Sequence, residues 1–206
     1  MDIPDARAAP GRVVGIGASA GGVDALMRLL RHLDADIQAA LIVVLHVPAT
    51  GRSLLAPILE RQTALDVRVA EHGAVIEPGC VYVAPPDRHT LAAEGRLRLD
   101  RGPKENAARP AVDPLFRSLA AAYGERAVGV VLSGALADGS SGALAIKAAG
   151  GTVIVQDPDD AAVPSMPERA IRALGRADAV LTATEIGPAL AALADAALPN
   201  AIKAAK

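Results

Sequence analysis

Aromatic residues are scarce and excess positive charge is missing in this chain of 206 residues. It has no tryptophan, two tyrosines and one phenylalanine, and its formal net charge is -2 with a pI near 6.1. A nucleic-acid-binding surface usually combines a basic patch with aromatic side chains on which bases stack. The composition therefore argues against nucleic acid as a partner.

Cysteine and long apolar runs are scarce as well. The single cysteine, Cys80, has no partner for a disulfide within the chain, and its strand-like neighbours Val81 and Val83 indicate a small buried apolar residue. No apolar run reaches the ~18 residues of a membrane-spanning helix, and the N-terminus does not read as a signal peptide. We therefore expect a cytoplasmic protein without membrane insertion. The histidines are scattered without the spacing of metal ligands, so we predict no metal and no other cofactor.

Apolar residues, in contrast, make up 51% of the sequence, which is ample for the core of one domain. Short apolar runs alternate with amphipathic stretches. This alternation predicts a single α/β domain with a doubly wound, mainly parallel β-sheet flanked by helices. Residues 90–101 are expected to form an antiparallel hairpin near one edge of the sheet. We expect a disordered leader over residues 1–11, the domain over residues 12–198 and a C-terminal tail over residues 199–206.

The most informative stretch is residues 13–22, VVGIGASAGG, which precede a helical pattern of leucines. This order predicts a strand, a tight turn and a helix. Residues 17–21 fit G-x-S-x-G, a turn that lifts a nucleophilic serine, here Ser19, above a sheet. The glycines at 15, 17 and 21 also approach a dinucleotide-binding fingerprint. Any tight strand-to-helix turn needs small residues, so these ten residues alone leave all three interpretations open.

Three chemically complementary side chains follow predicted strands. Ser19 follows the first strand, His46 follows the apolar run at 41–45, and Asp138 lies just beyond the strand predicted at 128–134. Ligands bind at the carboxyl ends of strands in such sheets. A hydroxyl, an imidazole and a carboxylate can act as nucleophile, base and orienting group. The nucleotide alternative loses ground because the second strand does not end in the acidic residue that binds a ribose.

Other polar residues receive simpler interpretations. Asp157 also follows a strand and is the main rival of Asp138, although its Asp-Pro-Asp-Asp setting is typical of an exposed turn. Residues 102–111 are predicted to be a surface loop, and Asp113 to be the N-cap of a helix that runs to about Tyr123. We expect His32 to be solvated, His72 to lie in a turn and His89 to stabilise a loop.

With these residues in place, the sequence resembles the catalytic domain of the chemotaxis protein-glutamate methylesterases, the CheB family. The resemblance extends over residues 12–194 and depends on spaced motifs in order: residues 15–22, 44–48, 83–89, 109–116, 129–139, 155–157 and 166–167. The family's catalytic serine, histidine and aspartate fall on Ser19, His46 and Asp138. The resemblance implies hydrolysis of glutamyl methyl esters in the helical cytoplasmic region of methyl-accepting chemoreceptors, sometimes with deamidation of glutamine. It implies an acyl-enzyme and no metal.

The chain departs from the family pattern beside these residues. Ala20 replaces the usual threonine after the serine, and Gly134-Ala135-Leu136 replaces Gly-Met-Gly. The backbone amides of Ala20 and Ala135 are still expected to bind an oxyanion, whereas Leu136 is expected to crowd the cleft or shift its backbone. Well-known members carry an N-terminal receiver domain, which eleven residues cannot supply. We expect that the chain is unregulated in cis, that control comes from a separate partner such as a response regulator, or that the sequence is trimmed before Met1. The alternative function is an esterase-like binding module of a chemosensory pathway that has lost catalysis.

Overall fold

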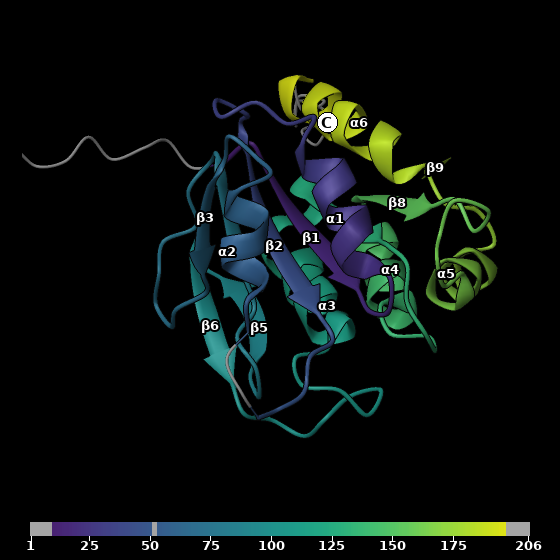
Figure 1. Ribbon diagram of the computed structural model, residues 1–206, viewed down its shortest axis with the longest axis horizontal. Helices are drawn as coiled ribbons and strands as arrows, with labels where there is room; N and C mark the ends of the chain where they lie inside the picture. The colour runs from purple at the N-terminus through teal and green to yellow at the C-terminus, as the bar shows by residue number, and fades with distance from the viewer. Residues whose placement is uncertain (1–9, 51–52, 197–206) are drawn as a thin grey trace, which may run out of the picture.

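The computed structural model describes residues 10–50 and 53–196. Seven strands form one sheet in the order β3-β4-β2-β1-β7-β8-β9, and every neighbouring pair is parallel (Figure 1). The strands are β1 (Arg12–Ala18), β2 (Ala39–Leu45), β3 (Asp66–Val69), β4 (Cys80–Val83), β7 (Ala127–Val131), β8 (Thr152–Gln156) and β9 (Ala179–Leu181). The predicted doubly wound parallel sheet is confirmed.

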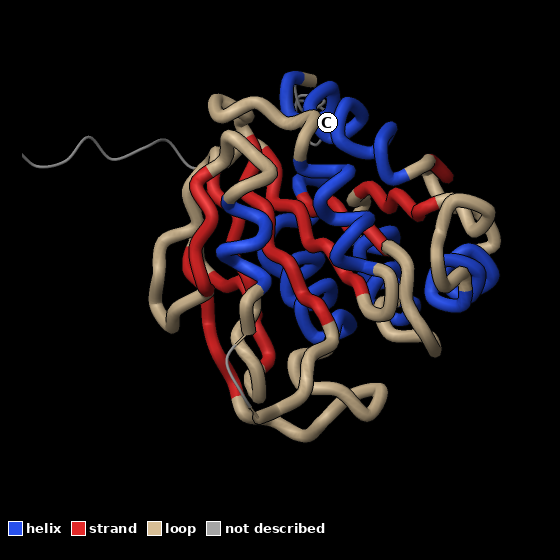
Figure 2. The backbone as a smooth tube through the Cα atoms, viewed as in Figure 1, coloured by secondary structure: helices blue, strands red, loops and turns tan. Residues whose placement is uncertain are grey.

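The central strands are apolar on both faces because helices cover both sides of the sheet. All residues of β1 and β2 are buried. On one face lie α1 (Gly22–Leu30), α2 (Leu55–Glu60) and α6 (Ala183–Asp195); on the other lie α3 (Val112–Tyr123), α4 (Ser140–Ala148) and α5 (Ser165–Leu174). A short 3-10 helix, Gly124–Arg126, follows α3. The strands thus lie between two layers of helices (Figure 2).

Glycines in β1 allow α3 to pack directly against the sheet. A Cβ added at Gly15 would lie 2.6 Å from Cδ1 of Leu119, and one added at Gly17 would collide with both methyl groups of Val112. Both helix residues are fully buried. The close contact places the N-terminus of α3 beside the carboxyl end of β1.

The predicted hairpin is also confirmed, as β5 (His89–Ala93) and β6 (Arg96–Asp100). These strands form a separate two-stranded antiparallel sheet. The hairpin packs on α3, where the hydroxyl of Ser118 accepts a hydrogen bond from the Ala92 amide at 3.0 Å. The hairpin therefore supports the same helix that packs on β1.

Two details differ from the sequence predictions. The N-cap of α3 is Ala111 and not Asp113, which lies inside the first turn and is 5% exposed. The loop at 102–111 is not wholly a surface loop, because Pro110 and Ala111 are buried. The pattern Asp-Pro suggested an N-cap, but the side chain of Asp113 is engaged elsewhere.

The ends of the chain are described only in part. Residues 1–9 of the predicted leader lie outside the described residues, and so do residues 197–206, which include the predicted tail. Pro10 is buried and the Gly11 amide donates to the Gln38 carbonyl at 2.9 Å, so both belong to the folded domain. Cys80 is buried, as predicted. None of the helices in the described ranges is long and apolar enough to cross a membrane.

Candidate active site

The three predicted site residues meet at the carboxyl ends of adjacent strands. Strand β1 lies between β2 and β7, which is the point where the strand order reverses. Ser19 directly follows β1 and His46 directly follows β2, and the His46 amide donates to the Ala18 carbonyl at 3.1 Å. Asp138 lies in the loop between β7 and α4. The topology thus brings together residues that are up to 119 positions apart, from 19 to 138.

His46 and Asp138 form a hydrogen-bonded pair. Nε2 of His46 lies 2.7 Å from Oδ2 of Asp138, and the two side chains are 17% and 0% exposed. Burial is the largest influence on the pKa of Asp138 and would raise it, but hydrogen bonds from His46, Val112 and Asp113 outweigh burial and hold that pKa below its ordinary value. Asp138 is therefore an ionised acceptor at neutral pH. Nε2 must carry the proton, which leaves the lone pair of Nδ1 free to act as a base.

Four further donors complete the surroundings of the Asp138 carboxylate. The first amides of α3 supply two of them, from Val112 to Oδ2 at 2.7 Å and from Asp113 to Oδ1 at 3.0 Å. The Gly139 amide and Nδ2 of Asn106 also donate to Oδ1, at 3.0 and 2.8 Å. The positive end of α3 therefore binds the carboxylate of Asp138.

Ser19 lies in a tight turn that a second serine braces. Gly21 has φ 75° and caps α1, and a Cβ added there would lie 2.7 Å from both Ala162 Cβ and Ser133 Oγ. The Ser133 hydroxyl donates to the Ala20 carbonyl at 2.8 Å and accepts from the Val163 amide at 2.9 Å. These bonds fix the turn between β1 and α1.

The hydroxyl of Ser19 makes no hydrogen bond to His46 or to any other residue within the described ranges. Such contacts are often long in the absence of substrate and tighten in the reacting complex. Gly134 lies against Ser19, because a Cβ added at Gly134 would be 2.8 Å from the serine Cβ. The same Cβ would collide with the side chain of Met166 in α5. The loop after β7 therefore lies between Ser19 and α5.

Three residues near Ser19 depart from the family pattern. Ala20 lies in the turn between β1 and α1, and Ala135 and Leu136 lie in the loop between β7 and α4. Neither the Ala20 nor the Ala135 amide donates a hydrogen bond to another residue that the structure describes, so both remain available to a ligand. Leu136 has φ 69°, in the left-handed region, and its side chain is 60% exposed. Leu136 thus has a backbone conformation that favours glycine, and whether its side chain crowds the cleft stays a prediction.

The rival residues lie elsewhere. Asp157 accepts a hydrogen bond from the Asp159 amide at 2.9 Å within a turn, and His46 contacts Asp138 instead. His72 accepts from the Leu99 amide at 3.2 Å, in a turn as predicted, and His32 is exposed. Sequence reasoning missed Asn106, Ser133 and Met166, which all contact the site. Of these, only Asn106 follows a pattern that signals function, a polar loop close to a predicted helix start.

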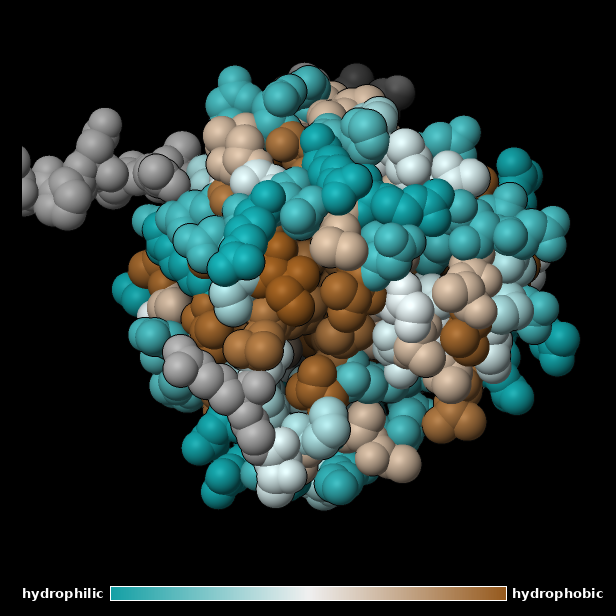
Figure 3. All heavy atoms as spheres, in the orientation of Figure 1, coloured by the Kyte–Doolittle hydropathy of each residue, from teal (hydrophilic) through white to brown (hydrophobic). Residues whose placement is uncertain are grey.

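An apolar groove begins next to His46, whose chain neighbours Leu45 and Val47 line it. The other lining residues are Val23, Pro48, Thr50, Ser53, Leu54, Leu55, Ile58 and Pro86. Leu54 is 63% and Ile58 39% exposed. Figure 3 shows apolar side chains gathered around this hollow on the face that carries α1 and α2. The groove offers a surface for apolar parts of a partner next to the imidazole.

Comparisons with known proteins agree on one family. A family model described as CheB methylesterase matches residues 14–190. Protein-glutamate methylesterase/protein-glutamine glutaminase 1 of Paramagnetospirillum magneticum is 41% identical over 190 residues, which cover 90% of this chain and 50% of the relative. Protein 3 of the same name from Anaeromyxobacter dehalogenans is 45% identical over 183 residues, 88% of this chain and 53% of the relative. The chain thus spans about half the length of these curated relatives.

A solved structure matches at the level of the fold and covers nearly all of its own chain. The crystal structure of the Thermotoga maritima CheB methylesterase catalytic domain has a TM-score of 0.85 and 37% sequence identity to this chain. The match covers 89% of this chain and 98% of that one. The architecture described above is therefore the architecture of that catalytic domain.

Proposed function

The chain belongs to the CheB methylesterase family, and on this premise we propose that it is a serine carboxylesterase acting on glutamyl methyl esters of chemoreceptors in the cytoplasm. The same site would deamidate glutamine, as the names of its relatives indicate for those proteins. The observation that carries the proposal is the 2.7 Å pair of His46 and Asp138 beside the Ser19 turn. Hydroxyl, base and orienting carboxylate follow from one fold feature, the carboxyl ends of β1, β2 and β7.

In the first half of the proposed reaction, Nδ1 of His46 takes the proton of Ser19 as Oγ attacks the ester carbonyl carbon. The carbonyl π electrons move to oxygen, and the amides of Ala20 and Ala135 bind the resulting oxyanion. When the tetrahedral intermediate collapses, the bond to the methoxy group breaks and His46 returns its proton to that oxygen. Methanol leaves, and the glutamyl group stays on Ser19 as an ester.

In the second half, water takes the place of methanol. His46 removes a proton from the water as its oxygen attacks the acyl carbon, and then protonates Oγ of Ser19 as the glutamate leaves. With a glutamine substrate, the first leaving group is ammonia and the second half is the same. Asp138 keeps Nε2 protonated and stabilises the imidazolium that forms in each half. No step needs a metal or cofactor.

We propose a chemoreceptor helix as the partner and the groove beside His46 as its place of contact. A helix of a receptor presents apolar side chains on one face, and the apolar lining of the groove suits such a face. Control by a separate response regulator is proposed as well. The family and the groove's position support the first proposal, and the family alone supports the second.

The test is methanol release from a methylated cytoplasmic chemoreceptor fragment, with Ser19→Ala and Ser141→Ala as a matched pair. Ser141 is an exposed serine on α4, and its side chain makes no hydrogen bond to Asp138. We expect release by the wild type and Ser141→Ala, and a loss of at least about 10³-fold in Ser19→Ala. Binding of the fragment by folded wild type without methanol release would favour the non-catalytic binding module.

A further inference from the structure

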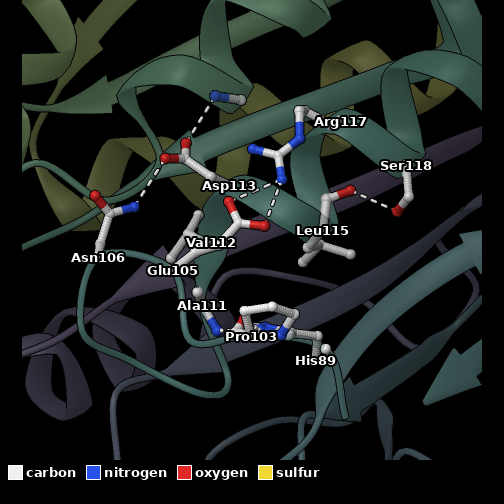
Figure 4. A network of polar contacts seen from close by, with 12 residues as sticks. His89, Pro103, Glu105, Asn106, Ala111, Val112, Asp113, Leu115, Arg117 and Ser118 are labelled. Atoms are coloured by element: carbon white, nitrogen blue, oxygen red, sulfur yellow. Dashed lines mark hydrogen bonds and ion pairs between the residues drawn. The ribbon is translucent and has the colours of Figure 1, made fainter. Parts of the chain in front are cut away.

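The loop at residues 102–111 delivers one side chain to the centre of the polar network. Nδ2 of Asn106 donates to Oδ1 of Asp138 at 2.8 Å and to Oδ2 of Asp113 at 2.9 Å. The two acids are 0% and 5% exposed. Figure 4 shows the Asn106 amide pointing at Asp113. One neutral amide group thus lies between two buried carboxylates.

The chemistry of the acceptors fixes the orientation of this amide. The NH₂ group of asparagine has two hydrogens, so it can serve two acceptors at once. The opposite orientation would place the Asn106 carbonyl oxygen against two carboxylate oxygens, with no hydrogen between them. Only the orientation that donates from Nδ2 to both acids satisfies the network.

The loop itself is held in place from several sides. The His89 ring donates from Nε2 to the Pro103 carbonyl at 2.9 Å and accepts at Nδ1 from the Ala111 amide at 3.2 Å. Arg109 donates to Oδ1 of Asp87 at 3.0 and 2.6 Å. Glu105 accepts from Arg117 of α3 at 2.7 and 2.8 Å (Figure 4). These anchors give Asn106 a fixed position, so its contact with Asp138 is a built feature of the fold.

Asp113 has no contact with His46 and serves the network in another way. Its Oδ1 accepts from the Gly142 amide of α4 at 2.7 Å, and its Oδ2 accepts from Asn106. The Gly142 amide of α4 therefore holds the Asp113 carboxylate in place, and that carboxylate holds the side-chain amide of Asn106. Among the described residues, Asn106 is the only side chain other than His46 that donates to Asp138.

We propose that Asn106 is a positioning residue for the reaction: it holds Oδ1 of Asp138 so that Oδ2 faces Nε2 of His46, and Asp113 orients its amide. This inference rests on the proposed function, because it concerns the acid that orients the base. Among the described residues, Oδ2 has one donor besides His46, the Val112 amide, whereas Oδ1 has three. The set of bonds on Oδ1 therefore sets the angle at which the carboxylate meets the imidazole.

Two substitutions remove the amide donor without straining the backbone. Asn106 has φ 49°, a left-handed conformation that glycine adopts freely and that aspartate tolerates. Asn106→Gly removes the side chain, and Asn106→Asp keeps its size but replaces the donor by an acceptor. Lys104→Ala is the matched control, since Lys104 is an exposed residue of the same loop that makes no hydrogen bond or ion pair to a described residue.

We expect kcat for methanol release to fall about 10- to 100-fold in Asn106→Gly, as for other residues that orient a functional side chain through one hydrogen bond. KM should stay within about twofold, because Asn106 does not line the groove. Asn106→Asp should lose at least as much, because it places a third acid beside two buried ones. Lys104→Ala should keep the wild-type kcat.

A second measurement needs no substrate and separates this inference from the proposed function. The Nε2 proton of His46, bound to a buried carboxylate, should give a low-field proton NMR resonance that disappears in His46→Gln. We expect that resonance to move or broaden in Asn106→Gly and to stay in place in Lys104→Ala. A wild type without esterase activity would overturn the proposed function but leave this test intact.

Three results for the Asn106 variants decide whether Asn106 is a positioning residue. A folded Asn106→Gly protein with the wild-type kcat and an unchanged resonance would overturn the positioning role. Loss of the folded state in both variants, judged by circular dichroism and melting temperature, would also overturn it, because Asn106 would then be a folding residue. A folded variant with a lower kcat, the wild-type KM and an altered resonance supports it.

Discussion

At the scale of single residues, the number of donors around a carboxylate decides its charge. Asp138 and Asp113 are both buried, yet their pKa values move in opposite directions. Asp138 has five donors, and its pKa is lowered although burial alone would raise it. Asp113 has only the Gly142 amide and Asn106, so burial prevails and its pKa is raised. Asp138 is therefore an ionised acceptor for His46, whereas burial disfavours the ionised form of Asp113.

Among the described non-glycine residues with a positive φ, Leu136 has the largest apolar side chain. A non-glycine residue in the left-handed region costs about 1 kcal/mol or more, and at 60% exposure Leu136 recovers little of this by burial. We expect Leu136→Gly to raise the free energy of unfolding by about 0–1 kcal/mol, since glycine's extra freedom in the unfolded chain offsets part of the gain. Urea unfolding measures this.

The control for Leu136→Gly is Glu94→Gly, in the hairpin turn far from Ser19. Glu94 has φ 53°, so glycine should relieve its backbone in the same way. A gain in stability in both variants with a change in esterase activity only in Leu136→Gly would assign the leucine side chain to the cleft. A fall in the stability of Leu136→Gly would show that the side chain makes contacts which outweigh its backbone strain.

At the scale of elements, the contact of α3 with β1 links the core to the site. Gly17 of β1 lies against Val112, and the amide of Val112 is one of the two donors to Oδ2 of Asp138. Packing between a strand and a helix therefore sets the position of a hydrogen bond to the carboxylate. The short turn at Ser19 depends on the same principle, because Gly21 and Ser133 leave space only for a tight backbone.

Gly17→Ala should disturb both stability and activity. The added methyl group would collide with a buried β-branched side chain that cannot turn away, so we expect a loss of about 1–3 kcal/mol in the free energy of unfolding. The shift of α3 would also move the Val112 amide away from Asp138 and lower kcat. Thermal unfolding and methanol release measure the two effects.

Gly102→Ala serves as the control, because its added Cβ would meet only the flexible end of the Asp100 side chain, at 2.7 Å. Stability and kcat close to the wild type are expected there. If Gly17→Ala also kept the wild-type kcat while losing stability, the position of α3 would not govern the site.

At the scale of the whole molecule, loops from distant parts of the chain meet at the carboxyl ends of the strands. The carboxyl groups of the folded protein make its free energy of unfolding depend on pH. The pKa values of Asp138, Asp160, Asp87 and Glu185 are all lowered in the folded state, whereas that of Asp113 is raised. A lowered carboxyl pKa stabilises the fold above the unfolded value of about 4. That stabilisation is lost as the pH falls through the folded pKa.

We therefore expect the free energy of unfolding to fall steadily below about pH 4. Asp138→Asn should be less stable than the wild type at pH 7, because five donors then face a side chain that cannot accept them all. The difference should narrow as the pH falls below about 4, because the wild type then loses the stabilisation that the ionised Asp138 provides and the variant has no such stabilisation to lose. Urea unfolding at pH 7 and at pH 3 tests this, and a difference that does not change with pH would contradict it.

The sequence by itself determined the class of fold and predicted the three candidate site residues. A run such as that of β2, apolar at every position, indicates a strand buried on both faces. Ser19, His46 and Asp138 each follow an apolar run that predicts such a strand. The hairpin was predictable for the same reason, because its alternation and its Glu94-Gly95 turn are local. These features need no knowledge of distant contacts.

Only the tertiary structure decided how the site is supported. Asn106 lies 32 positions from Asp138, and Ser133 lies 113 positions from Ala20, so no local pattern records either bond. Asp113 looked like a helix cap because Asp-Pro often begins a helix, but the N-terminus of α3 is occupied by Asp138 from another loop. Hydrogen bonds between distant segments depend on how layers pack, and periodicity and turn propensity describe only neighbours along the chain.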